Sequence, residues 1–316
     1  MSPFTTSSLP RFRVQANTNV LFGQQKLVLG FLGCGKMGTA LIKSFCAAGY
    51  CNFIVYDPHQ EQLRKAKKQL QLLFRAAASP TKKPKHHTFS FILARDPIEV
   101  ANACSILFLA VKPQDIAQVV SSLQAAPTQK ASAKSPVASK LVVSIAAGVQ
   151  IKTLQALLPQ AKIIRVMPNI ACLVKEMAAG YAVGKGVSRK EAKLVHTLLQ
   201  TGGKAFLLDE KDLDVVTALS GSGPAFFASI VQAMANQAQK EGLDPSVAYA
   251  LAVQTMKGTA ALLETIPPDE LVRMVASPHG TTVAGLQVFE KQKLAQIIQQ
   301  AVAAAAKRSR QLAKQK

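Results

Sequence analysis

Short apolar runs alternate with amphipathic stretches over the first two thirds of the chain. The amphipathic stretches repeat apolar residues every three to four positions, which is the spacing of one helix face. The apolar runs have the length of strands and occupy residues 26–32, 52–56, 89–93, 105–110, 141–146, 162–166, 178–184 and 204–208. The amphipathic stretches cover 37–48, 60–74, 116–123, 151–158 and 189–199. Strands that alternate with helices predict an α/β fold with a Rossmann-type, doubly wound parallel sheet.

The pattern changes after residue 209, where only helical periodicity remains. Helices are predicted over 225–240, 245–264, 269–275, 281–290 and 293–313. Several are apolar around much of their circumference, which indicates burial against a second subunit. We therefore predict three parts: a flexible basic extension (1–26), a dinucleotide-binding Rossmann domain (27–209) and an all-α domain for substrate binding and dimerisation (210–316).

The sequence GCGKMG stands between the first predicted strand and the first predicted helix. Gly33, Gly35 and Gly38 fit the loop in which a tight turn, a close pyrophosphate and close helix packing each favour glycine. The free N–H groups of the following helix start favour a phosphate. A tight glycine turn without a ligand is the alternative. The cofactor residues predicted in this segment are Leu32, Gly33, Cys34, Gly35, Lys36, Met37 and Gly38.

Asp57 ends the second strand, where an acidic side chain can accept hydrogen bonds from the adenosine ribose and repel a 2'-phosphate. This interpretation favours NADH over NADPH. His59 and Arg64 are close enough in sequence to bind a phosphate instead, and Asp57 can also serve only as the cap of the next helix. NADPH and NADH both stay open as cofactors.

Two further loops follow strands at the edge of the sheet where ligands bind in such folds. LAVKPQ follows the fourth strand, and in it Lys112 can lie over the cofactor. SIAAG follows the fifth strand, and its small residues leave room for a flat nicotinamide ring. The cofactor residues predicted here are Ala110, Val111, Lys112, Pro113, Ala146 and Ala147.

Composition adds a strong basic excess. The net charge is +21 and the pI about 10.0, a balance that attracts polyanions non-specifically. Only 6% of residues are aromatic and no nucleic-acid-binding motif is present, so we expect no specific nucleic-acid partner. Part of the excess lies in lysine-rich stretches at 79–88 and 127–140, which we interpret as solvated loops.

Cysteine usage and the N-terminal residues bear on the compartment. The five cysteines show neither metal-ligand spacing nor a disulfide framework, so we expect no metal site and a reducing compartment such as the cytoplasm. Residues 1–26 contain Ser, Thr and Arg but no acid, which also suits an organellar transit peptide. No apolar run is long enough to predict a membrane span.

Two stretches of the helical part are more specific than any of these features. ALSGSGPAFF (218–227) and SPHGTT (277–282) resemble the two signature stretches of the pyrroline-5-carboxylate reductase family. FLGCGKMG, LAVKPQ, VVSIAAG and RVMPN match that family's order, and the resemblance covers roughly residues 27–312. It implies reduction of 1-pyrroline-5-carboxylate to L-proline by NADPH or NADH, the last step of proline biosynthesis. It also implies a homodimer within a larger oligomer such as a decamer.

The helix predicted to start near residue 281 carries the groups that a cyclic imino acid needs. Backbone N–H groups of Gly280, Thr281 and Thr282 can hold its carboxylate. The Thr282 hydroxyl can hydrogen-bond the ring nitrogen while the neighbouring carbon accepts a hydride from the cofactor. By resemblance, Thr282 matches the family's substrate-nitrogen threonine, and Ser277 belongs to the same signature. An ordinary helix cap that contains proline is the alternative.

Three features depart from the family's usual pattern. His279 stands where the family usually has glycine, and at positive φ a non-glycine residue costs about 1 kcal/mol or more. We expect its side chain to point to solvent. MPNIAC lacks the Thr-Pro that often follows Asn169, and residues 65–87 are longer than the family needs between its second and third strands.

Two other functions stay open from the sequence. A 3-hydroxyacid dehydrogenase of the 6-phosphogluconate type has the same order of domains and needs a lysine acid/base, for which Lys240 is a candidate. A non-catalytic polyanion-binding protein on this scaffold accounts for the net charge. The imine ring can have five or six members, because one methylene changes pocket fit by only about 1 to 3 kcal/mol.

Overall fold

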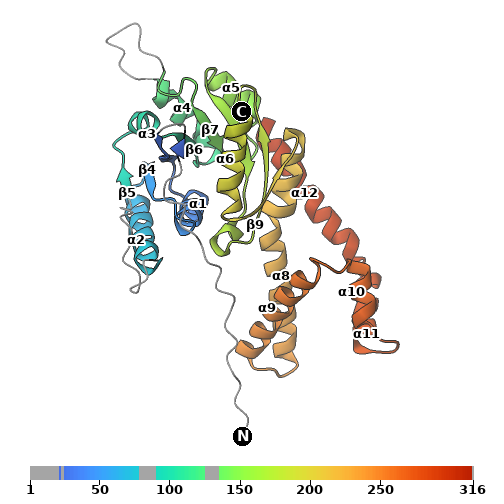
Figure 1. The fold of residues 1–316 in the computed structure, drawn as a ribbon. Coiled ribbons are helices and arrows are strands. Elements are labelled where there is room, and N and C mark those ends of the chain that lie inside the picture. Colours follow the sequence, from blue (N-terminus) through green and yellow to red (C-terminus); the bar gives the residue numbers. More distant parts are fainter. Residues whose placement is uncertain (1–20, 23–24, 78–89, 125–134, 315–316) are drawn as a thin grey trace. The chain divides into compact units, whose positions relative to one another are not determined.

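The computed structural model describes residues 21–22, 25–77, 90–124 and 135–314 (Figure 1). The chain forms two compact units that divide between Leu213 and Asp214. The Rossmann unit extends to Leu213 and includes the chain from Leu312 onward, and the helical unit is Asp214–Gln311. Each unit is described below by itself.

One eight-stranded sheet forms the centre of the Rossmann unit, in the order β10-β9-β8-β7-β6-β3-β4-β5. Its strands are β3 (Leu29–Leu32), β4 (Asn52–Tyr56), β5 (Ser90–Leu93), β6 (Ile106–Leu109), β7 (Leu141–Ser144), β8 (Lys162–Met167), β9 (Met177–Val183) and β10 (Gly203–Leu207). All eight were predicted from the apolar runs. The chain order reverses direction between β3 and β6, so their carboxyl ends flank the crevice where ligands bind in open α/β sheets.

One strand pairing differs from the predicted all-parallel sheet. β8 and β9 pair antiparallel, with Ile164 opposite Val183, whereas β10 pairs parallel to β9. Only residues 168–176 connect β8 to β9, and most of them form the 3-10 turn η2 (Ile170–Val174). A parallel pairing needs a crossover of a dozen or more residues, so this connection permits only the antiparallel one.

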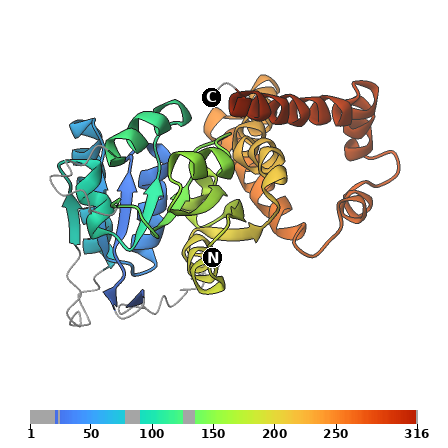
Figure 2. The same cartoon turned by 90° about the horizontal axis from the view of Figure 1, so that it is seen from above.

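Helices cover both faces of the sheet (Figure 2), which explains why the central strands β3, β6 and β7 are buried along their whole length. They are α1 (Lys36–Ala47), α2 (Gln60–Ala77), α3 (Pro97–Ala103), α4 (Ile116–Gln124), α5 (Ile151–Leu157) and α6 (Arg189–Gln200). Residues of α1, α2 and α6 share one core cluster with Phe31 and Phe108, whose rings stack at 4.6 Å between centroids. Residues of α3, α4 and α5 share the second cluster with Leu32 and Leu107.

Several local features were not predicted. Helix α3 has only seven residues, too few to show a period, and Asp96 caps it by accepting the Glu99 N–H. In the predicted flexible extension, β1 (Leu21–Phe22) pairs with β2 (Gln25–Lys26). Residues 1–20 and most of the predicted basic loops lie outside the described residues. Lys140, assigned to one of those loops, donates a hydrogen bond to the Cys104 carbonyl at 2.6 Å.

The helical unit contains no strand among its described residues, as predicted. It consists of the end of α7 (Leu213–Val216), a π-helical turn (Thr217–Gly221), α8 (Gly223–Lys240), α9 (Pro245–Leu262), α10 (Pro268–Val275), α11 (Thr281–Lys291) and most of α12 (Leu294–Lys314). Its buried apolar residues are five alanines and Val231. Larger apolar side chains are exposed, among them Phe227, Tyr249, Leu251, Met274, Val275 and Phe289. A unit with so little buried apolar surface depends on further contacts for its stability.

Candidate active site

A groove of about 1080 Å³ lies at the carboxyl ends of β3, β6, β7 and β8 in the Rossmann unit. This volume is slightly above the range of about 300 to 1,000 Å³ that is usual for ligand pockets. The strand ends bring together loops that are far apart in the sequence. The predicted cofactor residues that line the groove are Cys34, Gly35, Lys36, Met37, Ala110, Val111, Lys112, Pro113, Ala146 and Ala147.

A second cavity of about 400 Å³ adjoins it on the β4 side. Gly33 and Asp57 line this cavity together with Tyr56 and His59, and Gly35 and Ala110 to Lys112 line both cavities. This arrangement suits a ligand with two lobes joined near Gly35. A dinucleotide has this form, with a pyrophosphate between its two nucleosides.

Two of the predicted cofactor residues line neither cavity. Leu32 is completely buried and packs in the second core cluster, so its side chain belongs to the core. Gly38 is buried beneath the loop: a Cβ on it would lie 2.6 Å from the Gly33 carbonyl oxygen. Both residues therefore shape the loop from behind.

Each glycine of the loop has its own physical reason. Gly33 has φ of 103°, and a Cβ there would lie 2.6 Å from the Ala110 carbonyl oxygen. Gly38 allows α1 to approach the loop. At Gly35, by contrast, no heavy atom lies within 4 Å of the Cβ position. The space beside Gly35 is thus available to a ligand, as close approach of a pyrophosphate requires.

The start of α1 is suited to an anion. Gly35 is the N-cap, it provides no side-chain cap, and the first turn contains no acidic residue. The first N–H groups of a helix have no partner within the helix and carry a partial positive charge. The groove therefore fits a dinucleotide phosphate at this point by shape and by charge.

Cys34, between the first two glycines, is held in place on several sides. Its N–H donates to Asp57 Oδ2 at 2.7 Å, and its carbonyl accepts the Thr39 hydroxyl at 2.8 Å. Burial, with the neighbouring Asp57 carboxylate, raises the pKa of the Cys34 thiol to about 12, although a hydrogen bond with Thr39 lowers it. The thiol therefore stays protonated at neutral pH and is unsuited to act as a nucleophile.

Sequence reasoning missed several residues of the groove. Four of them come from the facing sides of α1 and α2: Thr39, Lys43, Gln62 and Lys65. Met167 ends β8 and Pro168 follows it. The RVMPN match was the only sequence signal for the last pair. The lysines and glutamine follow the ordinary polar pattern of a helix surface, and only the packing of α1 against α2 brings them into the groove.

The SPHGTT segment forms a turn that leads directly into α11 in the helical unit. The Gly280 N–H donates to the Ser277 carbonyl at 3.0 Å, and Gly280 is the N-cap of a helix that starts at Thr281. No side chain caps this helix start, and its first turn has no acidic residue. Thr282 is half-buried and Thr281 is exposed. The predicted helix start is confirmed, and its N–H groups are oriented as an anion site requires.

His279, which stands where the family usually has glycine, has a positive φ of 57°. Histidine tolerates this left-handed region better than most residues. A Cβ at Gly280 would lie 2.5 Å from Ser277 Oγ and 3.0 Å from the Ser277 carbonyl oxygen, so glycine suits this close turn. The histidine side chain is exposed in the single chain.

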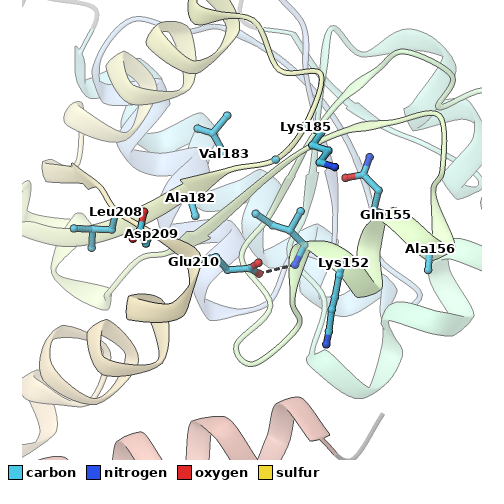
Figure 3. A pocket seen from close by; sticks show the side chains of 11 residues that line it. Lys152, Gln155, Ala156, Ala182, Val183, Lys185, Leu208, Asp209 and Glu210 are labelled. Carbon is cyan, nitrogen blue, oxygen red and sulfur yellow. Dashed lines mark hydrogen bonds between the residues drawn. The ribbon is translucent and has the colours of Figure 1, made fainter.

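A third cavity, of about 690 Å³, lies beside α5 and β9 and contains none of the predicted site residues (Figure 3). Glu210 is its most constrained polar group. Its Oε1 accepts the Ile151 N–H at 2.6 Å and pairs with Arg165 at 3.2 Å. These bonds attach the segment after β10 to β8 and to the start of α5, which indicates a structural role.

Comparisons with known proteins match both parts of the chain to known families. A family model described as pyrroline-5-carboxylate reductase dimerisation matches residues 210–312, and one described as NADP oxidoreductase, coenzyme F420-dependent, matches residues 28–148. The pyrroline-5-carboxylate reductase of Methanosarcina acetivorans is 37% identical over 90% of this chain and 98% of its own length. Pyrroline-5-carboxylate reductase 2 of Bacillus subtilis is 33% identical over 91% and 95%.

A solved structure extends this similarity to three dimensions. The Plasmodium falciparum pyrroline carboxylate reductase with NADP bound is 28% identical, with a TM-score of 0.75, and the match covers 92% of this chain and 100% of that one. Fold and groove together define an NAD(P)-dependent oxidoreductase with a helical part that forms homo-oligomers. The chain belongs to the pyrroline-5-carboxylate reductase family. The predicted family, fold class and enzyme class are confirmed.

Alanine substitutions at Gly35 and at Gly38 should have contrasting effects on cofactor binding and on stability. In Gly35→Ala the new methyl group enters open space, so we expect the free energy of unfolding to fall by no more than about 1 kcal/mol, while the Kd for the dinucleotide rises about tenfold. In Gly38→Ala the methyl group meets the Gly33 carbonyl, and we expect a stability loss of about 1 to 3 kcal/mol. Denaturant unfolding and cofactor titration measure both. Equal stability losses in the two variants would contradict this assignment.

Proposed function

We propose that this chain reduces 1-pyrroline-5-carboxylate to L-proline with NADPH or NADH. In this reaction a hydride from the reduced nicotinamide adds to the carbon of the C=N bond, the ring nitrogen takes up one proton from solvent, and the cofactor is left oxidised. The observation that carries the proposal is the pairing, in one chain, of the glycine-loop groove with the uncapped start of α11 that presents Thr282. Family membership supports the same reaction.

The helical unit supplies the substrate groups in this proposal. The backbone N–H groups at the start of α11, those of Thr281 and Thr282, hold the substrate carboxylate with the partial positive charge of the helix. The Thr282 hydroxyl hydrogen-bonds the ring nitrogen, which fixes the face of the ring that receives the hydride. Ser277 and Gly280 keep the preceding turn tight enough for this helix start.

The Rossmann unit holds the dinucleotide. The N–H groups of Gly35 and Lys36 bind its pyrophosphate, Lys112 lies beside it, and the small side chains of Ala146 and Ala147 leave space for the nicotinamide ring. Once bound, the cofactor supplies the hydride, so the protein needs no strong base of its own. A ribose contact by Asp57 would favour NADH, as its place in the sequence suggests.

A homodimer, assembled into a larger oligomer such as a decamer, is the form we propose for the protein. The apolar side chains exposed on α8, α9, α10 and α11 support it, because burial against another copy would remove them from water.

The stretch Glu210–Lys240 is long and apolar enough, by length and composition alone, to cross a membrane. It lies in the region matched by the dimerisation model, so coverage by a second copy also accounts for its apolar surface.

The cytoplasm is the compartment we propose. All five cysteines are free and buried, which suits a reducing environment. A transit peptide within residues 1–26 is the alternative, and most of that segment lies outside the described residues.

The reaction is tested by adding 1-pyrroline-5-carboxylate to the purified chain with NADPH or with NADH and following oxidation of the cofactor at 340 nm. We expect turnover, with L-proline formed in equal amount. The six-membered imine, a 3-hydroxyacid with the oxidised cofactor, and DNA at several salt concentrations serve as comparison substrates and ligands. No imine reduction by the folded oligomer, together with hydroxyacid oxidation or steep salt-dependent DNA binding, would overturn the proposal.

Thr282→Ala isolates the role of the hydroxyl. We expect kcat to fall about 100-fold because the ring nitrogen loses its hydrogen-bond partner, while the Kd for the cofactor changes less than twofold. His279→Gly is the matched control in the same turn, and it should keep kcat within about twofold because glycine accepts the positive φ. A loss of cofactor binding in Thr282→Ala would show that the residue has another role.

The oligomer makes a separate prediction. By light scattering, we expect the unmodified chain to have a mass in solution of at least two chains. Tyr249→Lys places a charge on the apolar surface of α9. This variant should shift the distribution toward smaller species and lower the melting temperature. Lys257→Ala on the same helix serves as control and should leave the mass unchanged. A stable monomer for the unmodified chain would contradict the proposed assembly.

A further inference from the structure

Both oxygens of the Asp57 carboxylate accept backbone hydrogen bonds beside the glycine loop. Its Oδ2 accepts the N–H of Cys34 at 2.7 Å and its Oδ1 accepts the N–H of His59 at 2.8 Å. The residue is only 4% exposed. We propose that Asp57 is a positioning residue that holds the glycine loop ready for the cofactor pyrophosphate, rather than the residue that distinguishes NADH from NADPH. This inference rests on the proposed function only for the nature of the cofactor.

The contacts of Cys34 explain how one carboxylate can set the geometry of the loop. The Cys34 N–H is fixed by Asp57 at the end of β4, and its carbonyl is fixed by Thr39 in α1. The next residues, Gly35 and Lys36, have no such bonds from side chains and present their N–H groups at the helix start. The Cys34 carbonyl and the Gly35 N–H belong to one planar peptide unit, so holding Cys34 orients in advance the first N–H group that meets the pyrophosphate.

The same bonds reduce what Asp57 can do at the ribose. Each carboxylate oxygen already accepts a short hydrogen bond from an N–H dipole, which offsets part of the negative charge that would repel a 2'-phosphate. The cavity on this side is also lined by His59, Lys112 and Asp115. The electrostatic potential at the 2' position is therefore set by several groups of both signs, and the Asp57 carboxylate is the one withdrawn from solvent.

The two possible roles of Asp57 predict opposite changes for NADPH in the variant Asp57→Asn. If Asp57 hydrogen-bonds the ribose and repels a 2'-phosphate, removal of its charge weakens NADH binding and strengthens NADPH binding. If Asp57 holds the loop, the side-chain NH2 of the new asparagine faces a backbone N–H that had donated to the carboxylate. That hydrogen bond is lost, and the protein loses affinity for both cofactors. We expect the Kd values for NADH and NADPH to rise by the same factor, about tenfold.

Thr39→Val provides a second and independent variant. It removes the bond to the Cys34 carbonyl at nearly constant volume and leaves the carboxylate in place. The positioning role predicts that the Kd values for NADH and NADPH again rise together, by a smaller factor, because Asp57 alone then holds the Cys34 peptide; unchanged Kd values would contradict it. This variant keeps the test decisive if Asp57→Asn does not fold.

Asp244→Asn is the matched control, because the Asp244 carboxylate also accepts two backbone N–H groups, those of Ser246 and Val247 at 2.9 and 3.2 Å, at the start of α9. It should leave both cofactor Kd values unchanged. The measurement is direct titration of the full chain with each cofactor, followed by the fluorescence of the reduced nicotinamide. It needs no imine, so it remains readable if the chain reduces a different substrate. Tighter NADPH binding in Asp57→Asn, or unchanged Kd values for both cofactors, overturns the inference.

Discussion

The close backbone approach at Gly33 is the contact on which the groove depends. The Gly33 N–H donates to the Tyr56 carbonyl at 2.8 Å, and the space that a Cβ would need is occupied by the Ala110 peptide. The ends of β3, β4 and β6 therefore meet around one residue that has no side chain. A larger residue would push β6 away, and the two cavities that meet there would separate from the start of α1.

The sequence predicted the elements of the Rossmann unit well because their periodicity is local. It could not predict how the last strands pair, since the direction of β9 follows from the short connection through η2 and not from any apolar run. Asp57 shows the same limit at the site. Its place at the end of β4 was evident from the sequence, whereas its bond to Cys34 depends on the path of a glycine loop 23 residues away in the chain.

The signature stretches of the helical unit were informative for a different reason. SPHGTT indicated a helix start, and α11 does begin at Thr281. His279, two residues earlier, has a positive φ. In ALSGSGPAFF, Pro224 lies in the first turn of α8, where its fixed φ suits a helix, and an unpredicted π-helical turn over Thr217–Gly221 precedes it. A π-turn has no apolar period of its own, so only coordinates reveal it.

The alanine-rich interior of the helical unit has a consequence for how the protein exists in a cell. The Rossmann unit buries phenylalanine, leucine and isoleucine within its own sheet, whereas the helical unit hides little more than methyl groups. Its native state therefore gains free energy from mass action between chains, and dilution weakens folding and assembly together. Newly made chains that have not yet met a partner expose apolar helices, which are the surfaces that chaperones and proteases recognise. The amount of working protein then rises more steeply than the amount of chain synthesised.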